Sequence, residues 1–182
     1  MMEFRKAEKN DMVRIMELIR QAKAFLKANG VDQWQDGYPE QRDIEGDIRD
    51  GIGYVLTDDD VVIAYTGIDF RGEPAYKSLR GQWLNEEPYA VIHRTAVDNA
   101  VKGKGLAQHL FAQAERIARE RGVYNIRIDT DEDNKIMRHV IEKMGFVYCG
   151  VVIFANSPKI AFQKCVHPSR PGKRKRYHTG SS

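Results

Sequence analysis

Cysteine is almost absent from this chain, which has only Cys149 and Cys165 among its 182 residues. The two lack the spacing of zinc ligands, and so small a number excludes the disulfide framework of a small secreted protein. We therefore expect both to be small hydrophobic residues of the core, and we expect no metal site.

Long apolar runs are absent as well. No stretch approaches the length of a membrane span, and the first residues, Met-Met-Glu-Phe-Arg-Lys, have no signal-peptide core. These two absences lead us to expect a cytoplasmic protein that does not associate with membranes.

A large charge of one sign is missing from the main part of the chain. The net charge is +3, but residues 166–182 carry five Lys or Arg and no acid, which leaves residues 1–165 at about −2. A slightly acidic body is not a nucleic-acid-binding surface, so no nucleic-acid partner is expected. Residues 166–182 are poor in apolar residues and should form a flexible tail, although a basic run could also attract nucleic acid or an acidic protein.

What the chain does contain indicates one ordinary globular domain over residues 1–165. Hydrophobic residues make up 42% and charged residues 30%, and apolar residues recur with either helical or strand periodicity. The expected strands cover residues 3–7, 54–57, 61–70, 89–98, 124–130, 146–154 and 159–165, and the expected helices cover residues 10–30, 39–51, 106–121 and 134–145. This order predicts the α/β (α+β) class with one core.

A glycine-rich turn, Lys102 to Ala107 (KGKGLA), lies between the expected strand 89–98 and the helix that follows. Such a turn leaves backbone N–H groups free at the positive end of a helix dipole, where phosphate oxygens bind. The run lacks the form of a Walker A loop, and Gln108 stands where a dinucleotide fingerprint needs Gly or Ala. It therefore predicts a phosphorylated ligand of another kind, with an ordinary glycine turn as the alternative.

Two motifs together carry a resemblance to a known family. The run fits [QRK]-x-x-G-x-[GA] after a strand ending Thr-Ala-Val, and it resembles the pyrophosphate loop of the GNAT-family N-acetyltransferases, where Gln or Arg is more usual than Lys102. Asn134 then begins a helical run ending at Gly145-Phe146, which resembles the next signature of that family. The motifs stand in the family order at the family distance, and the resemblance is close over residues 89–154.

The resemblance implies a single GNAT-like domain with a mixed, mostly antiparallel sheet of about six or seven strands flanked by helices. The sheet would splay between the strands at 89–98 and 124–130. Acetyl-CoA would be the cosubstrate, and the acetyl group would pass to a primary amine of a small molecule or protein by direct attack in a ternary complex. The implied cofactor-binding residues are Thr95, Ala96, Val97, Lys102, Gly103, Lys104, Gly105, Leu106, Ala107, Gln108 and Asn134. Asn is also common at the start of a helix, which is the alternative role of Asn134.

Two catalytic positions lack the residue that relatives use. The Tyr that serves many of them as general acid falls at Ile141, and a Glu that serves several as base falls at Val91. His93 is our candidate catalytic residue, because strand alternation places it on the face of Val91, Thr95 and Val97, and its ordinary pKa suits neutral pH. A structural hydrogen bond at the sheet face is the alternative role for His93.

The leaving thiolate departs tolerably near neutral pH, and Tyr148, Tyr89 or solvent could protonate it. In the acceptor site, aromatic rings would pack against an alkyl amine and a carboxylate would attract it. The candidate substrate-binding residues are Trp34, Tyr38, Asp69 and Trp83, each of which could instead serve core or loop packing. The sequence identifies neither the acceptor nor the oligomeric state. It is compatible with a homodimer.

Two other function classes compete with the acetyltransferase. A coenzyme A-binding module without turnover is supported by Ile141 and Val91, which cannot transfer protons. A nucleic-acid-binding protein is supported only by the basic tail. The two ordered motifs favour the acetyltransferase.

Overall fold

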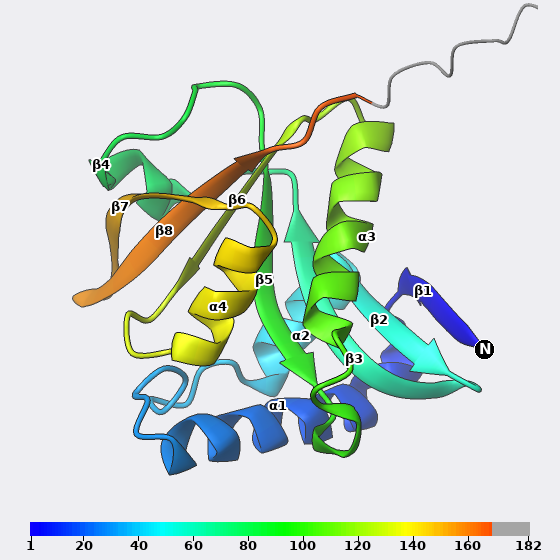
Figure 1. Ribbon diagram of the computed structural model, residues 1–182. Coiled ribbons are helices and arrows are strands. Elements are labelled where there is room, and N and C mark those ends of the chain that lie inside the picture. Colours follow the sequence, from blue (N-terminus) through cyan, green and yellow to red (C-terminus); the bar gives the residue numbers. More distant parts are fainter. Residues whose placement is uncertain (169–182) are drawn as a thin grey trace, which may run out of the picture.

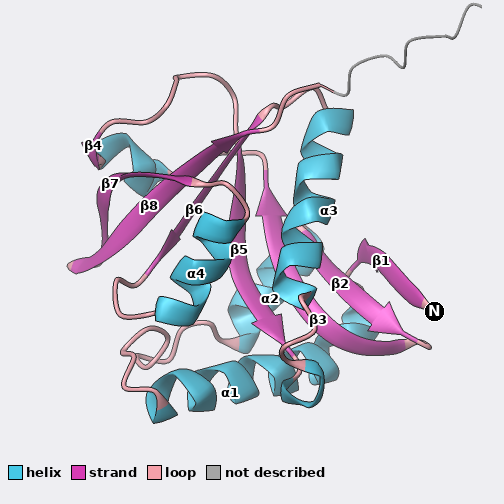
Figure 2. Cartoon of the chain, viewed as in Figure 1, coloured by secondary structure: helices cyan, strands magenta, loops and turns pink. Residues whose placement is uncertain are grey.

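The computed structural model describes residues 1–168, which form one eight-stranded sheet with helices on both faces (Figures 1 and 2). The strands are β1 (Met2–Lys6), β2 (Gly53–Asp58), β3 (Val61–Asp69), β4 (Arg80–Gly81), β5 (Ala90–Val97), β6 (Asn125–Thr130), β7 (Val147–Phe154) and β8 (Ser157–Cys165). The helices are α1 (Met12–Ala28), α2 (Gln41–Arg49), α3 (Leu106–Glu120) and α4 (Lys135–Lys143), with short 3₁₀ turns η1 (Lys9–Asp11), η2 (Pro74–Ser78) and η3 (Asn99–Val101).

The expected α/β class and mostly antiparallel sheet are confirmed, but the expected number of strands was too small. The connection between β3 and β5 contains η2 and the two-residue strand β4, which pairs with β7 and adds an eighth strand at the sheet edge. So short a strand has no periodicity that a sequence could reveal. The first helix also begins later than expected, because Glu8 and Asp11 form a capping box around η1 before α1 starts.

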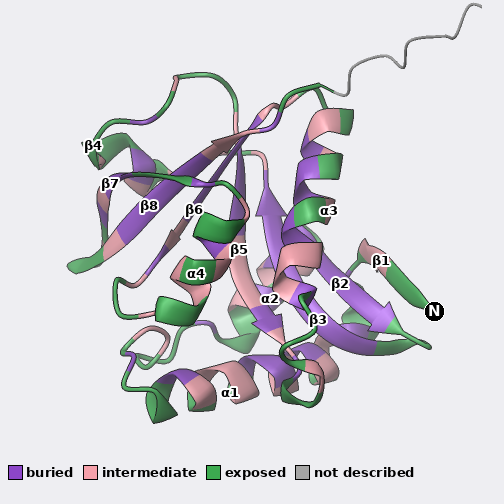
Figure 3. Cartoon of the chain, viewed as in Figure 1, coloured by how far each residue is buried: buried purple, intermediate pink, exposed green. Residues whose placement is uncertain are grey.

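Alternating side chains divide the core between the two faces of the sheet. In β2, Tyr54 and Leu56 pack with α3 and α4, whereas Val55 packs with α1 and α2. A third cluster, which includes Tyr76, Trp83 and Val91, covers the β6–β8 half of the face that α1 and α2 share. The segments coloured purple in Figure 3 are the buried residues that make up these layers.

The expected splay lies between β5 and β6, the parallel pair of neighbours in the sheet. Their ladder consists of two pairings, Ala90 with Ile126 and Val91 with Arg127, after which the strands diverge (Figure 1). The rest of each strand therefore has a backbone edge that does not pair with its neighbour. Such an edge can accept an extended ligand as an additional strand.

The end of the described chain is attached to the domain. Val166 is buried, and its N–H donates to the carbonyl of Tyr124 at 2.8 Å. Most of the expected basic tail, residues 169–182, lies outside the described residues. Within residues 1–168, no helix is both long enough and apolar enough to span a membrane.

Candidate functional site

The glycine-rich turn has the geometry expected of a phosphate loop. Gly103 and Gly105 adopt left-handed φ angles of 83° and 71°, and Gly105 is the N-cap of α3. Among the described residues, no carbonyl or side chain accepts a hydrogen bond from the N–H groups between Gly103 and Gln108; the first helical bond is donated by His109 to Gly105, at 3.0 Å. Free N–H groups at the positive end of a 15-residue helix favour an anion.

This turn is attached firmly to the end of β5 and to α1. Asp98 accepts a hydrogen bond from Ala100 N–H at 3.0 Å and forms an ion pair with Arg14 of α1. The Lys102 ammonium lies 3.3 Å from the centre of the Phe25 ring, also on α1. The turn therefore sits where β5 ends, and the splay opens in that same direction because the two pairings of β5 with β6 lie at the start of both strands.

Asn134 caps the N-terminus of α4, which is the alternative role that its sequence position predicted. Its Oδ1 accepts the N–H of Met137 at 3.2 Å as the cap of α4, and its Nδ2 donates to Gln33 at 2.9 Å. Gln33 also accepts a hydrogen bond from Thr130 at the end of β6. Gln108 is partly buried, with its Oε1 3.6 Å from where a side chain on Gly105 would begin.

A β-bulge in β5 corrects the expected placement of His93. Arg94 has a φ of 52°, and Arg94 and Thr95 together face one residue of β3. The extra residue reverses the alternation, so that Thr95 bonds Thr66 at 3.0 Å and Val97 packs with the α3 core. His93 therefore stays on the face of Val91, but Thr95 and Val97 lie on the opposite face.

The surroundings of His93 make it a weak proton acceptor. Burial and the Arg94 guanidinium lower the pKa of His93 to about 4, although the charge of Asp69 opposes this. A group with that pKa is neutral at pH 7 but binds a proton poorly.

Arg94 leaves the bulge toward α2 and forms a buried ion pair. Its Nε donates to Asp47 Oδ2 at 2.8 Å and its Nη2 donates to Oδ1, while Nη1 donates to the Tyr38 hydroxyl at 2.7 Å. The Tyr65 hydroxyl also donates to Asp47. The connection between α1 and α2 is thereby joined to β5 through Tyr38 and to β6 through Gln33, so it bridges the two diverging strands.

Replacing Asp47 by Ala should lower the free energy of unfolding by about 3–5 kcal/mol, because Arg94 would keep its charge in a buried place without a counter-ion. Urea unfolding at pH 7 measures this. Asp50→Ala is the matched control, since Asp50 pairs with Arg49 and Arg71 at the surface and its loss should cost less than about 1 kcal/mol. Equal losses in the two variants would contradict the importance of the buried pair.

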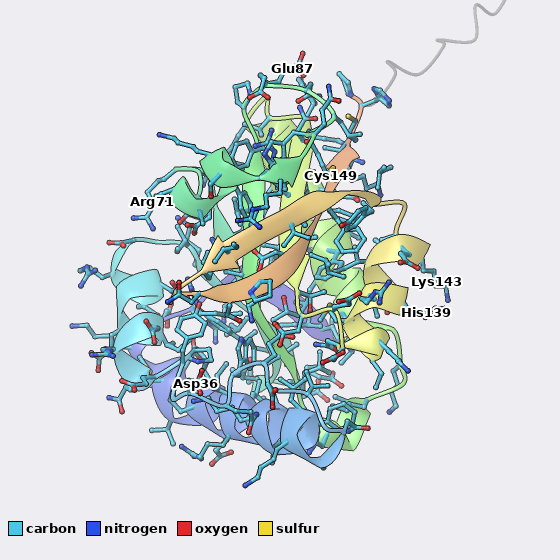
Figure 4. The ribbon with its side chains drawn as sticks, turned by 90° about the vertical axis from the view of Figure 1, so that its left-hand side faces the viewer. Asp36, Arg71, Glu87, His139, Lys143 and Cys149 are labelled. Atoms are coloured by element: carbon cyan, nitrogen blue, oxygen red, sulfur yellow. The ribbon has the colours of Figure 1, made fainter. Side chains whose placement is uncertain are left out.

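The four expected acceptor residues do not gather into one cluster. Trp34 packs against the core of α1 and α2, and Tyr38 bonds Arg94. Asp69 accepts three hydrogen bonds from Arg71, which Figure 4 shows at the edge between α2 and η2. Trp83 belongs to the third core cluster and donates its indole N–H to the carbonyl of Tyr76 at 3.0 Å.

The comparisons with known proteins agree with this geometry. A profile described as the acetyltransferase (GNAT) family matches residues 14–146. The chain belongs to the GNAT acetyltransferase family. Acetyl-CoA is the acyl donor of this family, and its members are acyltransferases.

Solved structures support the assignment. A GNAT-family acetyltransferase from Streptococcus agalactiae is 35% identical, with a TM-score of 0.82 over 91% of this chain and 96% of that one. The ribosomal-protein-S18-alanine N-acetyltransferase of Escherichia coli (14% identity, TM-score 0.63, 97% of this chain and 100% of that one) shares the fold. So does YncA of Salmonella typhimurium, solved with its cofactor acetyl-CoA (16%, 0.62, 93% and 96%). No sequence among the curated proteins matches the chain.

The position of the usual family Tyr contributes no acid here. Ile141 is fully buried in the core beneath α3 and α4. Tyr148 is 57% exposed with its ring against Phe162, and the Tyr89 hydroxyl accepts the N–H of Glu73. His139, on the outer side of α4 in Figure 4, is exposed.

Sequence reasoning missed Asp129, which lies on β6 beyond the last pairing with β5. Ile126 and Ile128 face the α3 core, so Asp129 faces the side of Val91 and His93. The Tyr76 hydroxyl donates to its Oδ2 at 2.6 Å, and the residue as a whole is partly buried. The same alternation in the sequence could have revealed it.

The electrostatic surroundings of Asp129 favour its neutral form more than those of an ordinary carboxyl. Burial raises the pKa of Asp129 to about 6. The Tyr76 hydrogen bond and the Lys159 charge oppose this shift, whereas Glu73 and Asp131 add to it. Lys159 itself is paired with Asp131. Asp129 is therefore a carboxylate that can take up and release a proton close to neutral pH.

Proposed function

We propose that the chain is an N-acetyltransferase that moves the acetyl group of acetyl-CoA to a primary amine by direct attack in a ternary complex. The observation that carries this proposal is the row of free N–H groups from Gly103 to Gln108, placed where β5 ends and the splay from β6 opens. A phosphate site that continues into an unpaired strand edge suits a diphosphate joined to a long amide-containing arm.

The residues that would hold acetyl-CoA come from three segments. The amides of the turn, with the Gln108 side chain, would bind the diphosphate. The backbone of Thr95, Ala96 and Val97, on the unpaired edge of β5, would pair with the arm, and a strand N–H there would stabilise the oxyanion. Asn134 would have to exchange its bond with Gln33 for one with the arm.

The chemistry requires a neutral amine. Attack of the amine nitrogen on the thioester carbon forms the N–C bond, breaks the C–S bond and releases coenzyme A as the thiolate, while the amine gives its proton to a base; the thiolate then takes a proton from solvent. An alkyl ammonium has a pKa near 10.4, so a base beside the amine accelerates the reaction. We assign that base to Asp129 rather than His93, because Asp129 lies on β6 beyond the last pairing with β5 and its pKa of about 6 is higher than that of His93, at about 4.

No side chain is assigned as general acid. Ile141 is buried and apolar, and a thiol with an ordinary pKa near 8.5 leaves as the thiolate without much assistance. The buried Ile141 and Val91 are also what supports the alternative of a coenzyme A-binding module without turnover. Asp129 favours the enzyme, because a binding module needs no proton acceptor at the splay.

Two measurements on the intact chain test the proposal. Coenzyme A at 100 times its dissociation constant should stabilise the protein by about 2.7 kcal/mol, seen as a rise in the unfolding temperature. A panel of amines with acetyl-CoA should release free thiol, detected by a chromogenic disulfide. Stabilisation without thiol release identifies the silent module. The absence of both effects would refute the loop assignment. The class of acceptor, small molecule or protein, and the cytoplasmic location stay predictions.

A further inference from the structure

A depression of about 380 Å³ lies on the face of the sheet that carries Val91 and Asp129, between β6 and the connection that joins β3 to β5. Its lining includes Tyr76, Trp83, Tyr89 and Arg127, and we call it the arginine pocket. It belongs to neither the phosphate loop nor the unpaired edge of β5. Tyr76 connects the pocket to the proposed base, because this residue lines the pocket and its hydroxyl donates a hydrogen bond to Asp129.

Arg127 is an unusual residue to find at the base of a pocket. It is only 4% exposed, and its guanidinium lies between the rings of Trp83 and Tyr89, 4.0 Å from the centre of each. Among the described residues no carboxylate lies within ion-pair distance of it, although Glu86 lines the same pocket. A buried charge without a counter-ion is costly, and burial accordingly lowers the pKa of Arg127.

The donors of Arg127 are only partly used. Nε donates to Gln163 at 3.3 Å and Nη2 donates to the carbonyl of Asn85 at 2.9 Å. A guanidinium has five N–H donors in a planar fork. The Tyr89 hydroxyl also interacts with the guanidinium and opposes the fall in the pKa of Arg127, and together these partners leave the fork only partly used among the described residues. Because the Trp83 and Tyr89 rings pack against the guanidinium, its remaining N–H edge is suited to a planar carboxylate.

The spacing along β6 connects this charge to the chemistry. Arg127 and Asp129 are two residues apart on one face of the strand, so their Cα atoms lie about 7 Å apart. The Arg127 side chain extends to Gln163 and the carbonyl of Asn85, and a carboxylate bound at its remaining edge would share this face of the sheet with Asp129. A small molecule that carries both groups would place its amine toward Asp129.

We propose that Arg127 binds the carboxylate of the amine acceptor, so that the acceptor is a small amino acid. This inference rests on the proposed acetyltransfer and adds the class of its substrate. The competing explanation is that Arg127 only clamps Trp83 and Tyr89, and with them the β3–β5 connection, to β6.

The wild-type protein provides the first test. Thiol release is compared between amino acids and their primary amides, which differ only in the charge at the carboxyl end. The amine of an amide loses its proton more readily, so chemistry alone favours the amide. We expect kcat/KM to be about 10- to 100-fold higher for the acid, as for a hydrogen-bonded charge pair. Equal values, or a preference for the amide, would overturn the proposal while leaving the acetyltransferase intact.

Variants at Arg127 separate recognition from clamping. Arg127→Met should lose about 10- to 100-fold in kcat/KM with the acid, mainly through KM, and change the amide rate less than about 3-fold. Arg127→Lys should recover only part of the loss, because it lacks the fork. Arg116→Met, at an exposed position of α3, is the control. A clamp predicts equal losses with acid and amide together with a lower unfolding temperature, and that result would reject the proposal.

A binding measurement without turnover separates this inference from the proposed function. In a Trp34→Phe background, Trp83 is the single remaining Trp and reports on the guanidinium beneath it. Titration with butyrate should change its fluorescence, with chloride at equal ionic strength as the reference and Arg127→Met abolishing the change. Butyrate binding without acetyl transfer to any amine would refute the proposed function and keep the pocket; no response would refute the pocket.

Discussion

Gly105→Val is expected to raise the dissociation constant of coenzyme A at least about 100-fold. Gly105 has φ 71° and ψ 24° at the N-cap of α3, a conformation that a β-branched residue adopts only at a cost of about 1–3 kcal/mol. The added side chain would meet nothing closer than Gln108 Oε1 at 3.6 Å, so no internal clash forces a change. Affinity would instead fall because the turn loses its conformation and the side chain occupies space that a phosphate needs.

Isothermal titration of coenzyme A against both proteins measures this effect, with Gly122→Val as the matched control. Gly122 follows the other end of α3 with a φ of 69°, and no atom lies within 4 Å of the position where its side chain would begin. The two substitutions should therefore cost similar backbone strain, but only the one in the turn should weaken binding. Unchanged affinity in Gly105→Val would remove the phosphate site from this turn, and equal loss in both variants would point to general destabilisation.

The parts of this protein that could be predicted from the sequence are those set by local periodicity or by the two motifs. The continuous apolar run of β3 and the helical spacing of Leu110, Ala114 and Ala118 determine elements within one or two residues of their observed ends. The splay was expected from the family resemblance alone. No residue pattern of β5 or β6 by itself shows that two neighbouring strands part after two pairings.

The bulge and the arginine pocket could not be predicted, because each depends on contacts between distant segments. Arg is an unusual residue for a left-handed conformation, and the pairing of Arg94 with Asp47 of α2 stabilises it there. The bulge then moved Thr95 and Val97 away from His93, which strict alternation had placed beside them. Likewise Trp83 was a candidate on its residue type, but its partner Arg127 lies 44 positions away in the chain.

Asp129→Asn is expected to lower kcat by about 10²–10⁴-fold and to leave coenzyme A affinity unchanged, because the amide cannot accept the proton of the attacking amine. His93→Ala is the comparison, since His93 shares the face but has a pKa of about 4 and should change kcat far less. Stopped-flow or steady-state thiol release gives the rates, and titration gives the affinity. A larger loss of kcat in His93→Ala than in Asp129→Asn would identify His93 on β5 as the catalytic base.

The pH dependence gives a signature that a structural role cannot imitate. Since Asp129 acts as the carboxylate and burial raises its pKa to about 6, wild-type kcat/KM should fall as pH decreases through about 6. The hydrogen bond from Tyr76 lowers this pKa, so Tyr76→Phe should move the acid limb to higher pH while keeping activity at the alkaline plateau. An acid limb that stays in place in Tyr76→Phe would separate Asp129 from the rate-limiting proton transfer.

Stability should change in the direction opposite to activity. The pKa of Asp129 is raised from 3.8 to about 6 on folding, so the folded state favours the protonated form. This contribution to stability is fully present below about pH 4 and is lost as pH rises through about 6. Asn resembles the neutral form at every pH, so Asp129→Asn should be at least as stable as the wild type between pH 7 and 8 by urea unfolding. If Asp129 is the catalytic base, its replacement by Asn lowers the rate without lowering the stability of the fold. If the role of Asp129 is purely structural, the variant should instead be less stable at pH 7.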